Sequence, residues 1–242
     1  MIKVRNLTKR YSSSTAVNAL SFTAPDGAVT GFLGPNGSGK STLAYTLAGH
    51  PKYEVTEGEV LLDGENILDM EIDERARAGL FLAMQYPVEV PGVSSSNFMR
   101  SAVTAVRGES PKLREWVGEL NAAREALQMD ASFSERSVNE GFSGGEKKRH
   151  EVMQLSLMKP KFAVMDETDS GLDVDALRIV SEGINRYQDE TGGGVLMITH
   201  YKRILNYVKP DFIHVFADGK IVQTGDSSLA DQLEAEGYEK FI

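Results

Sequence analysis

The sequence predicts an α/β fold, in which the strands of a β-sheet alternate along the chain with helices. Short apolar runs recur through the 242 residues, and segments with helical patterning separate them. A glycine-rich loop, GPNGSGKST, lies between one such run and the next helical segment. With 41% hydrophobic and 25% charged residues, the chain has the composition of a globular protein that buries a full core. Its length fits one large domain, or a core with a smaller inserted subdomain.

The expected strands are short apolar runs bounded by turn or loop residues. They are 2–5, 20–24, 29–33, 58–63, 80–85, 162–166, 194–199, 212–217 and 220–224. The last two form a hairpin, because Asp218-Gly219 between them favours a tight turn. The clearest helical patterns are 40–48, 111–128, 144–158 and 174–189.

The middle of the chain, residues 87–160, is expected to contain no strand and to form a helical insertion between two strands of the core. It begins with the Pro- and Ser-rich connector YPVEVPGVSSS, which suggests a hinge. The acidic tail LEAEGYEKFI is expected to form a capping helix and an end strand.

Charge, cysteine content and hydropathy exclude several classes of function. The net charge is −9, and the strongest basic cluster is KKR at 147–149, which argues against nucleic acid or an anionic bilayer as the main partner. The chain has no cysteine, so it cannot hold zinc or an iron–sulfur cluster through thiolates. No window approaches 18 uninterrupted apolar residues, and the N-terminus lacks a signal-peptide stretch. We expect a cytoplasmic protein without direct membrane insertion.

The loop GPNGSGKST fits the phosphate-binding pattern G-x-x-x-x-G-K-[ST] and follows a strand and precedes a helix, as that pattern requires. Glycines allow backbone N–H groups to turn inward around phosphate oxygens, and the helix N-terminus adds the positive end of its dipole. Lys40 would reach the β- and γ-phosphates of ATP, and the Ser41 hydroxyl would bind Mg²⁺. The predicted cradle consists of Gly34, Pro35, Asn36, Gly37, Ser38, Gly39, Lys40, Ser41 and Thr42.

A carboxylate pair for metal binding and hydrolysis is expected far downstream, at the end of an apolar strand. FAVMDE supplies Asp166, which would hold Mg²⁺ through water, and Glu167, which would orient and polarise the attacking water. Alone, such a pair could equally be a solvated strand end; the cradle favours the catalytic interpretation.

FSGGEKKR, residues 142–149, contains a second candidate anion site. Ser143, Gly144 and Gly145 open a predicted helix, whose N-terminal N–H groups can bind an anion. Two such sites in one chain make sense if the second completes a site on another copy. Here the chain resembles the ABC-type ATPases, whose signature is usually L-S-G-G-Q. The resemblance implies a head-to-tail homodimer formed with ATP, in which each ATP lies between one cradle and the partner's signature residues.

The resemblance covers essentially the whole chain and implies further roles. Gln85 matches the glutamine that contacts Mg²⁺ at the hinge to the helical subdomain, and His200 matches the switch histidine that senses the γ-phosphate. Tyr11 matches the aromatic residue that stacks on adenine, and SGLD at 170–173 matches the loop that crosses the dimer seam. On its own, a histidine after a strand or a tyrosine near a chain end is more often structural.

The implied fold is a P-loop NTPase core of ABC-ATPase type, with an inserted helical subdomain and an N-terminal antiparallel β subdomain. Residues 1–242 would form one ABC ATPase domain: 1–86 and 161–242 the nucleotide-binding core, and 87–160 the helical subdomain with the signature.

Most ABC-type ATPases energise a permease, but three departures argue against that reading. The signature ends in Glu146, Thr168 and Asp169 follow the catalytic pair where transporters usually have proline, and Gly171 replaces the usual alanine. Longer strings, including FLAMQYPVEVPGV, RSVNEGFSGGEKKRHE and DETDSGLDVDAL, closely resemble the SufC family, the ATPase subunits of the Suf iron–sulfur cluster assembly system.

That closer resemblance implies SufB- and SufD-like scaffold proteins as partners, which closure of two ATPase subunits on ATP would remodel. The expected docking region runs from Gln85 through YPVEVPGVSSSNF; the alternative is a solvated connector. The main alternative function is the ATP-binding subunit of a membrane importer or exporter. A soluble ABC protein acting on ribosomes or DNA normally joins two cassettes in one chain, and this chain has one.

Overall fold

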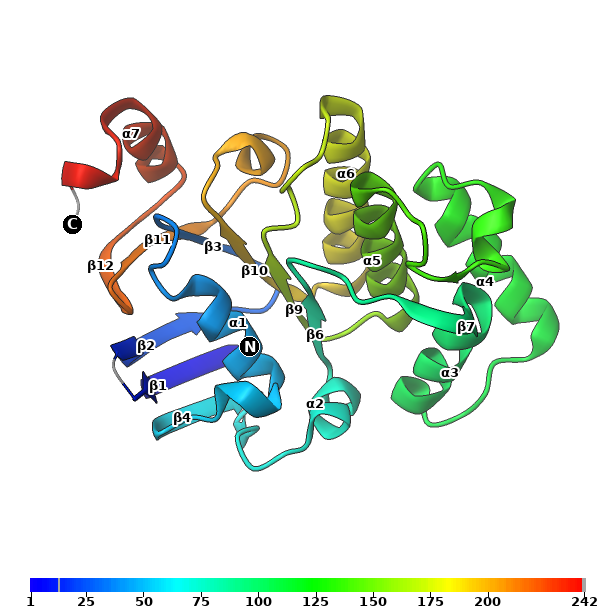
Figure 1. Ribbon diagram of the computed structural model, residues 1–242, viewed down its shortest axis with the longest axis horizontal. Helices are drawn as coiled ribbons and strands as arrows, with labels where there is room; N and C mark the ends of the chain where they lie inside the picture. The colour runs from blue at the N-terminus through cyan, green and yellow to red at the C-terminus, as the bar shows by residue number, and fades with distance from the viewer. Residues whose placement is uncertain (13, 241–242) are drawn as a thin grey trace.

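A six-stranded sheet crosses the centre of the molecule in the computed structural model, which describes residues 1–12 and 14–240 (Figure 1). Its strand order is β12-β11-β3-β10-β9-β6, with β12 antiparallel to β11 and the other five strands parallel. The strands are β3 (Val29–Leu33), β6 (Leu80–Ala83), β9 (Phe162–Asp166), β10 (Gly194–Thr199), β11 (Phe212–Ala217) and β12 (Lys220–Gly225). The α/β fold expected from the sequence is confirmed.

The parallel strands are buried on both faces, which explains why they are nearly continuous apolar runs. Successive side chains of a strand point to opposite faces, so β10 divides its residues between two cores. Val195 and Met197 belong to the core that includes the helices α5 and α6, whereas Leu196 and Ile198 belong to the core that includes α1. The sheet is therefore fixed from both sides, and its strand ends form a rigid edge.

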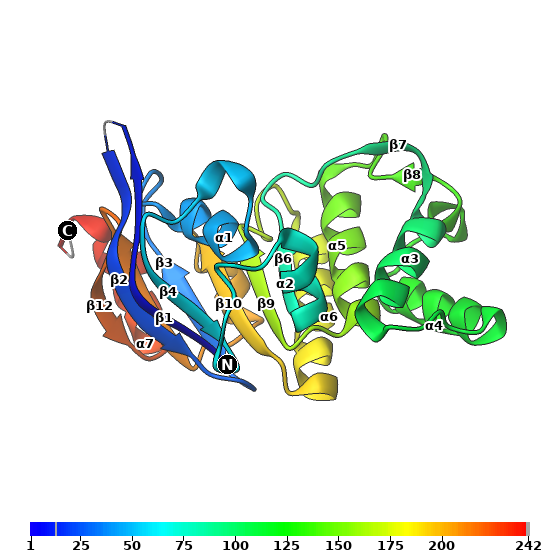
Figure 2. The same ribbon diagram turned by 90° about the horizontal axis from the view of Figure 1, so that it is seen from below.

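A second, antiparallel sheet in the order β2-β1-β4-β5 packs beside the first and shares the core of α1 (Figure 2). Its strands are β1 (Ile2–Tyr11), β2 (Ser14–Ala24), β4 (Glu57–Leu62) and β5 (Glu65–Asn66). The first two are longer than the apolar runs 2–5 and 20–24 indicate. Their far ends pair with each other in a partly exposed hairpin, so these residues do not stand out as apolar runs in the sequence. The helix α1 (Lys40–Ala48) lies between this sheet and the central one.

Between β6 and β9 the chain leaves the central sheet and forms the lobe at the right of Figure 1. This lobe contains α3 (Ser95–Arg107), α4 (Leu113–Ala126) and α5 (Gly144–Met158). The expectation of no strand in 87–160 is wrong, because β7 (Val90–Ser94) and β8 (Ser137–Val138) pair antiparallel inside it. Their pairing depends on a contact across 43 or more residues of chain, and Pro91 and Gly92 hide the strand pattern. Helix α2 (Ile72–Ala78), which precedes β6, was also not expected.

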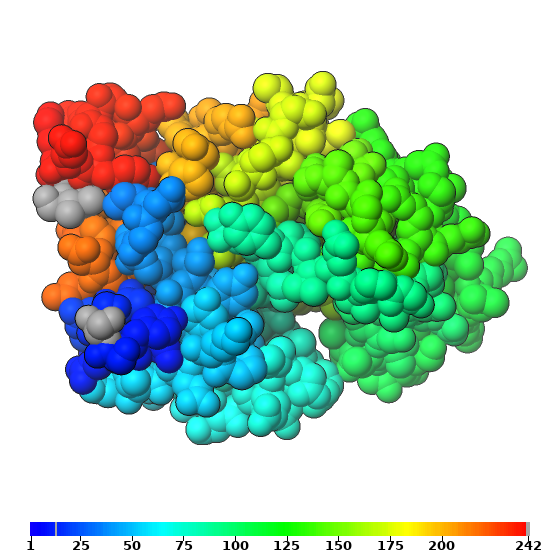
Figure 3. All heavy atoms as spheres, viewed as in Figure 1, coloured from blue at the N-terminus to red at the C-terminus, as the bar shows by residue number. Residues whose placement is uncertain are grey.

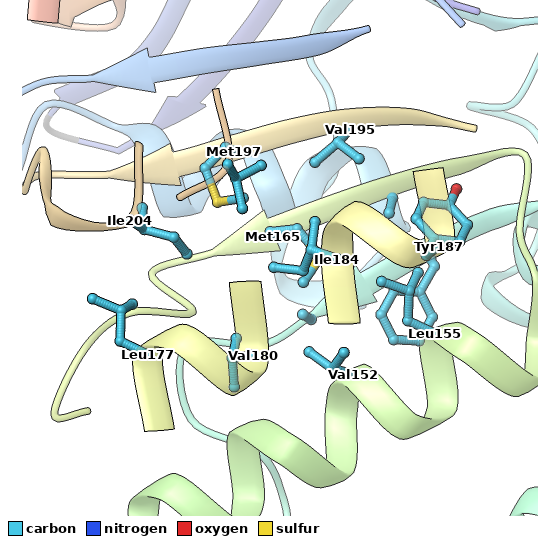
Figure 4. Packing of buried hydrophobic residues seen from close by; sticks show 14 of the residues in the cluster. Val152, Leu155, Met165, Leu177, Val180, Ile184, Tyr187, Val195, Met197 and Ile204 are labelled. Carbon is cyan, nitrogen blue, oxygen red and sulfur yellow. The ribbon is translucent and has the colours of Figure 1, made fainter. Parts of the chain in front are cut away.

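Helices α5 and α6 (Val174–Thr191) pack against one face of the sheet (Figure 4). Val152 and Leu155 of α5 face Val180 and Ile184 of α6. The helices approach closely at Gly183, where an added Cβ would lie 2.5 Å from a methyl carbon of Val152. This contact packs helix α5 closely against α6.

The C-terminal part of the described chain contains α7 (Ser228–Glu236), followed by a 3₁₀ turn at Tyr238–Lys240. The expected capping helix is present; the expected end strand is absent through residue 240, and 241–242 lie outside the described residues. Other 3₁₀ turns are Pro51–Tyr53, Ala131–Ser134 and Arg203–Asn206. Among the described residues, none of the helices is both long and apolar enough to span a membrane.

Candidate nucleotide-binding site

The carboxyl ends of four parallel strands carry the residues singled out by the sequence. The cradle follows β3, Gln85 follows β6, Asp166 and Glu167 stand at the end of β9, and His200 follows β10. Ligands of open α/β sheets bind in the crevice outside these ends, because the loops there converge from neighbouring strands. The topology therefore gathers side chains that are more than a hundred residues apart in the chain.

The cradle is a tight backbone turn that only glycine permits at two positions. A Cβ on Gly34 would lie 2.0 Å from the Phe216 carbonyl oxygen, and one on Gly39 would lie 2.1 Å from the Ala16 carbonyl oxygen. Gly39 also has φ of 104°, which L side chains rarely adopt. Beside the turn is a cavity of about 290 Å³ lined by Ala16, Asn36, Gly37, Gly39, Lys40, Ser41, Thr42, Gln85 and Glu167. The loop, the start of α1 and Glu167 thus share one cavity.

Lys40 is held inside the cradle by the loop itself. Its ammonium donates to the carbonyl oxygens of Gly34 at 2.7 Å and Pro35 at 2.9 Å, and to the Ser38 hydroxyl at 3.3 Å. Burial lowers the pKa of Lys40, while the nearby Glu167 and Asp166 carboxylates act in the opposite direction. A buried cation at the start of a helix, where the dipole is positive, is suited to a phosphate oxygen.

Ser41 and Asp166 form the group that fits Mg²⁺. The Ser41 hydroxyl donates to Asp166 Oδ1 at 3.2 Å, and the other oxygen, Oδ2, is buried without a hydrogen-bond partner among the described residues. Burial raises the pKa of Asp166 to about 6, and Glu167 adds to the rise. A buried carboxylate oxygen without a partner, beside a hydroxyl, is an oxygen set that Mg²⁺ prefers. In residues 1–12 and 14–240, no three His, Asp or Glu side chains cluster to hold a metal alone, so phosphate oxygens and water would complete this site.

Glu167 lies between Gln85 and His200. Its Oε2 accepts a hydrogen bond of 2.6 Å from Gln85 Nε2, and its Oε1 lies 3.3 Å from His200 Nδ1, without hydrogen-bond geometry. Glu167 is only 6% exposed and has φ of 47°, an uncommon value for a residue other than glycine. The structure therefore brings together three residues that the sequence places 82 and 33 positions apart.

The signature residues lie elsewhere on the surface. Ser143 is the N-cap of α5, and its side chain and that of Glu146 each accept a hydrogen bond from the other's backbone N–H. Ser143 and Gly144 are exposed and do not line the cavity beside the cradle. Glu146, a departure from the usual glutamine, completes this capping box, a role that either residue can fill. An exposed helix N-terminus away from its own cradle is available to a second copy.

Tyr11, the residue predicted to stack on adenine, does not line the cavity beside the cradle. It ends β1, is 40% exposed, and has the Lys9 ammonium 5.0 Å from its ring centroid. Ala16, on the neighbouring strand β2, lines the cavity instead. Stacking of Tyr11 on adenine stays a prediction.

Sequence reasoning missed several residues that support the site. The Thr199 hydroxyl lies 3.0 Å and 3.1 Å from the two Asp169 carboxylate oxygens, and both side chains are almost fully buried. The Tyr238 hydroxyl donates to the His200 carbonyl oxygen at 3.4 Å. The polar Thr-Asp pair that follows Asp166 and Glu167 in the sequence is a visible signal for Asp169, whereas nothing in the sequence indicates that the tail returns to His200.

Comparison with known proteins identifies the family. The family described as ABC transporter matches residues 17–170. A probable ABC transporter ATP-binding protein of Streptococcus pyogenes is 49% identical over 240 residues, covering 98% of this chain and 93% of its own length. The vegetative protein 296 of Bacillus subtilis is 54% identical over 209 residues, covering 86% and 80%. The probable ATP-dependent transporter ycf16 of Cyanophora paradoxa is 46% identical over 248 residues, covering 99% and 93%.

Solved structures agree on the fold. The dimeric structure of MJ0796, a bacterial ABC transporter cassette, has a TM-score of 0.82 at 20% identity and covers 94% of this chain and 99% of its own. A nucleotide-free ATP-binding cassette from an ABC transporter has a TM-score of 0.80 at 22% identity, covering 100% and 98%. With the glycine cradle, the strand-end carboxylates and the signature helix in place, the chain belongs to the ABC family as an ATP-binding cassette.

Proposed function

We propose that this cassette hydrolyses ATP with Mg²⁺ and uses the cycle to remodel a soluble SufB/SufD-type scaffold during iron–sulfur cluster assembly. The observation that carries the catalytic part is the convergence of Lys40, the Ser41–Asp166 pair and the Gln85–Glu167 pair at one edge of the sheet. These are the parts that phosphoryl transfer to water requires: a phosphate cradle, a metal site and a carboxylate that orients water.

In this mechanism, the cradle N–H groups and Lys40 bind the phosphates and stabilise the charge that develops on the transferred group. Ser41, Asp166 and Gln85 would hold Mg²⁺, which when bound neutralises phosphate charge. Glu167 would accept a hydrogen bond from the attacking water and polarise it, with Gln85 keeping the carboxylate in place. His200, beside the other oxygen of Glu167, would report the state of the γ-phosphate.

Dimerisation would supply the mechanical step. Ser143 and Gly144, which are exposed, and the half-buried Gly145 would bind the ATP held in the partner's cradle, because the positive end of helix α5 favours an anion. ATP then shifts the equilibrium toward the closed pair, because it contacts two copies there and one copy when open. Loss of the bridging phosphate after hydrolysis reopens the pair. We propose that residues 87–160 move as the helical subdomain in this cycle.

The scaffold is proposed to dock on the connector after β6. Tyr86 is 76% exposed and Val88 is 64% exposed, whereas large apolar side chains are usually covered. In Figure 3 this teal part of the chain lies at the surface, between the core and the helical lobe. The strings around this connector and the signature also carry the resemblance to the SufC family. Partner contact here would act directly beside Gln85.

The second candidate function is the ATP-binding subunit of a membrane transporter. The names of relatives favour it: the Streptococcus pyogenes relative is called a probable ABC transporter ATP-binding protein, and the ycf16 relative a probable ATP-dependent transporter. The same site chemistry and the same connector would serve a permease. The two functions therefore differ in the partner and not in the ATPase.

Isolation of the tagged chain from its own cells without detergent, followed by mass spectrometry, separates the two functions. Recovery of cysteine-bearing scaffold proteins from the soluble fraction supports the cluster-assembly function. Sedimentation with membranes together with a multi-span protein would overturn it. Val88→Ser should reduce partner recovery, and Leu113→Ser on α4, also 64% exposed, is the matched control that should not.

A further inference from the structure

Met84, the residue before Gln85, is held on both sides of its backbone by helix α5. Its N–H donates to Glu151 Oε1 at 2.7 Å, and its carbonyl oxygen accepts a hydrogen bond from the Lys148 ammonium. Lys148 and Glu151 also pair with each other at 3.2 Å between Nζ and Oε2. One ion pair on the signature helix therefore satisfies both backbone groups of a residue 64 positions earlier.

This ion pair is unusual in its burial. The side chains of Lys148 and Glu151 are 4% and 6% exposed. In every other pair of a Lys, Arg or His with a carboxylate among the described residues, both side chains are more exposed than these two. Burial raises the pKa of Glu151 to about 7, with Lys148 acting against that rise. A buried ion pair is weak evidence for stability, because desolvation of both ions offsets their attraction. The hydrogen bonds from Lys148 and to Glu151 at the Met84 backbone indicate that the pair positions this part of the chain.

The rest of the connector is fastened to the same part of the chain. The Lys147 ammonium lies 2.8 Å from Glu89 Oε1, and Asn139 Nδ2 donates to the Val88 carbonyl oxygen at 2.8 Å. Residues 84–89 are thus tied to the segment around the start of α5 at several points. The next side chain after Met84 is Gln85, which contacts Glu167 at 2.6 Å.

We propose that Lys148 and Glu151 are positioning residues that fix Gln85 against the catalytic carboxylate, so that the signature helix and the hydrolytic site move together. Neither residue needs to touch ATP. A shift of α5, which carries Ser143 at its N-terminus, is passed through the ion pair to the Met84 backbone and from there to Gln85. Docking of a second copy at the signature would in this way set the position of Glu167. The inference rests on the proposed ATP hydrolysis.

Two double variants test the pair without leaving a single buried charge. Lys148→Met with Glu151→Leu removes both side-chain hydrogen bonds to the Met84 backbone, and Lys148→Met with Glu151→Gln keeps an acceptor for the Met84 N–H. We expect kcat for ATP hydrolysis to fall about tenfold or more in the first and less in the second. The ATP dissociation constant should stay within about threefold, because the cradle is unchanged. Arg149→Met is the matched control: Arg149 is the next cation on α5, bonds to the Gln128 carbonyl oxygen, and should leave kcat within about twofold.

The decisive measurement combines the first double variant with Gln85→Ala. If the pair acts through Gln85, the combined variant hydrolyses ATP no more slowly than Gln85→Ala alone. If the fold-losses in kcat of the double variant and of Gln85→Ala instead multiply in the combined variant, the inference is overturned. A normal kcat in the double variant would overturn it as well. Thermal unfolding of each variant identifies a loss caused by misfolding, in which case kcat and ATP binding fall together with Tm and the positioning role is refuted. Failure of the wild-type chain to hydrolyse ATP, by contrast, would refute the proposed function itself.

Discussion

The Glu167→Gln substitution removes one negative charge from the strand-end cluster with almost no change in shape. A glutamine at this position can still accept from Gln85 Nε2, which lies 2.6 Å from the present carboxylate, and can face His200 with its other end. Its backbone keeps the same positive φ of 47°. The variant therefore tests the charge and basicity of Glu167 separately from its position.

The expected loss follows from what the neutral side chain can no longer do. It cannot take up the proton of the attacking water, and general-base catalysis of this kind contributes roughly 10²–10⁴-fold. That factor corresponds to about 3 to 5 kcal/mol in the activation free energy. The ATP dissociation constant should stay within about threefold of the wild-type value, because the substitution leaves Lys40 and its cradle contacts in place.

Phosphate release at saturating ATP measures kcat, equilibrium dialysis measures ATP affinity, and size-exclusion chromatography with ATP detects a trapped dimer. Glu182→Gln, on the exposed face of α6 and paired with Arg178, is the control that should behave like the wild type. The reasoning is refuted if Glu167→Gln releases phosphate at the normal rate. A variant that fails to bind ATP would instead show that Glu167 supports the cradle.

Three further outcomes are expected. Gly39→Ala should abolish ATP binding and lower Tm, because its Cβ would lie 2.1 Å from the Ala16 carbonyl oxygen. Gly37→Ala has open space at its Cβ and should lower the free energy of unfolding only by backbone strain of about 1–3 kcal/mol. Calorimetry of both variants distinguishes the two effects. Burial lowers the pKa of His150 to about 4, so as the pH falls His150 takes up its proton in the unfolded chain before it does so in the folded protein. The free energy of unfolding should therefore fall by about 3 kcal/mol from pH 6.5 to pH 4. Denaturant titrations at several pH values should show that His150→Leu loses this pH dependence. Tyr187→Phe should destabilise the fold by about 1 kcal/mol in urea, because it leaves a buried carbonyl oxygen without the 2.9 Å hydrogen bond from the Tyr187 hydroxyl.

The central sheet and the cradle were predictable because their signals are local. Buried parallel strands are short apolar runs, and β3, β9, β10 and β11 have the bounds that those runs indicate. The loop from Gly34 to Ser41 needs glycines at fixed spacing, which the sequence displays directly. The partly exposed elements were missed or shortened. Helix α3 was not predicted although its apolar residues gather on one face, which is the pattern of an amphipathic helix. The β7–β8 pairing joins segments far apart in the chain, which no local pattern can show.

The amino-acid sequence by itself determined the family of the cassette and the residue types at its strand ends, because phosphate binding demands particular residues within a few positions of one another. Only the tertiary structure decided which of them meet. Three contacts show this: the Gln85–Glu167 hydrogen bond, the Ser41–Asp166 hydrogen bond, and the hydrogen bonds of the buried Lys148–Glu151 pair to Met84. Each joins residues from different parts of the chain that only the fold brings near. Such contacts depend on where strands end and helices pack, and no local pattern in the chain records that geometry.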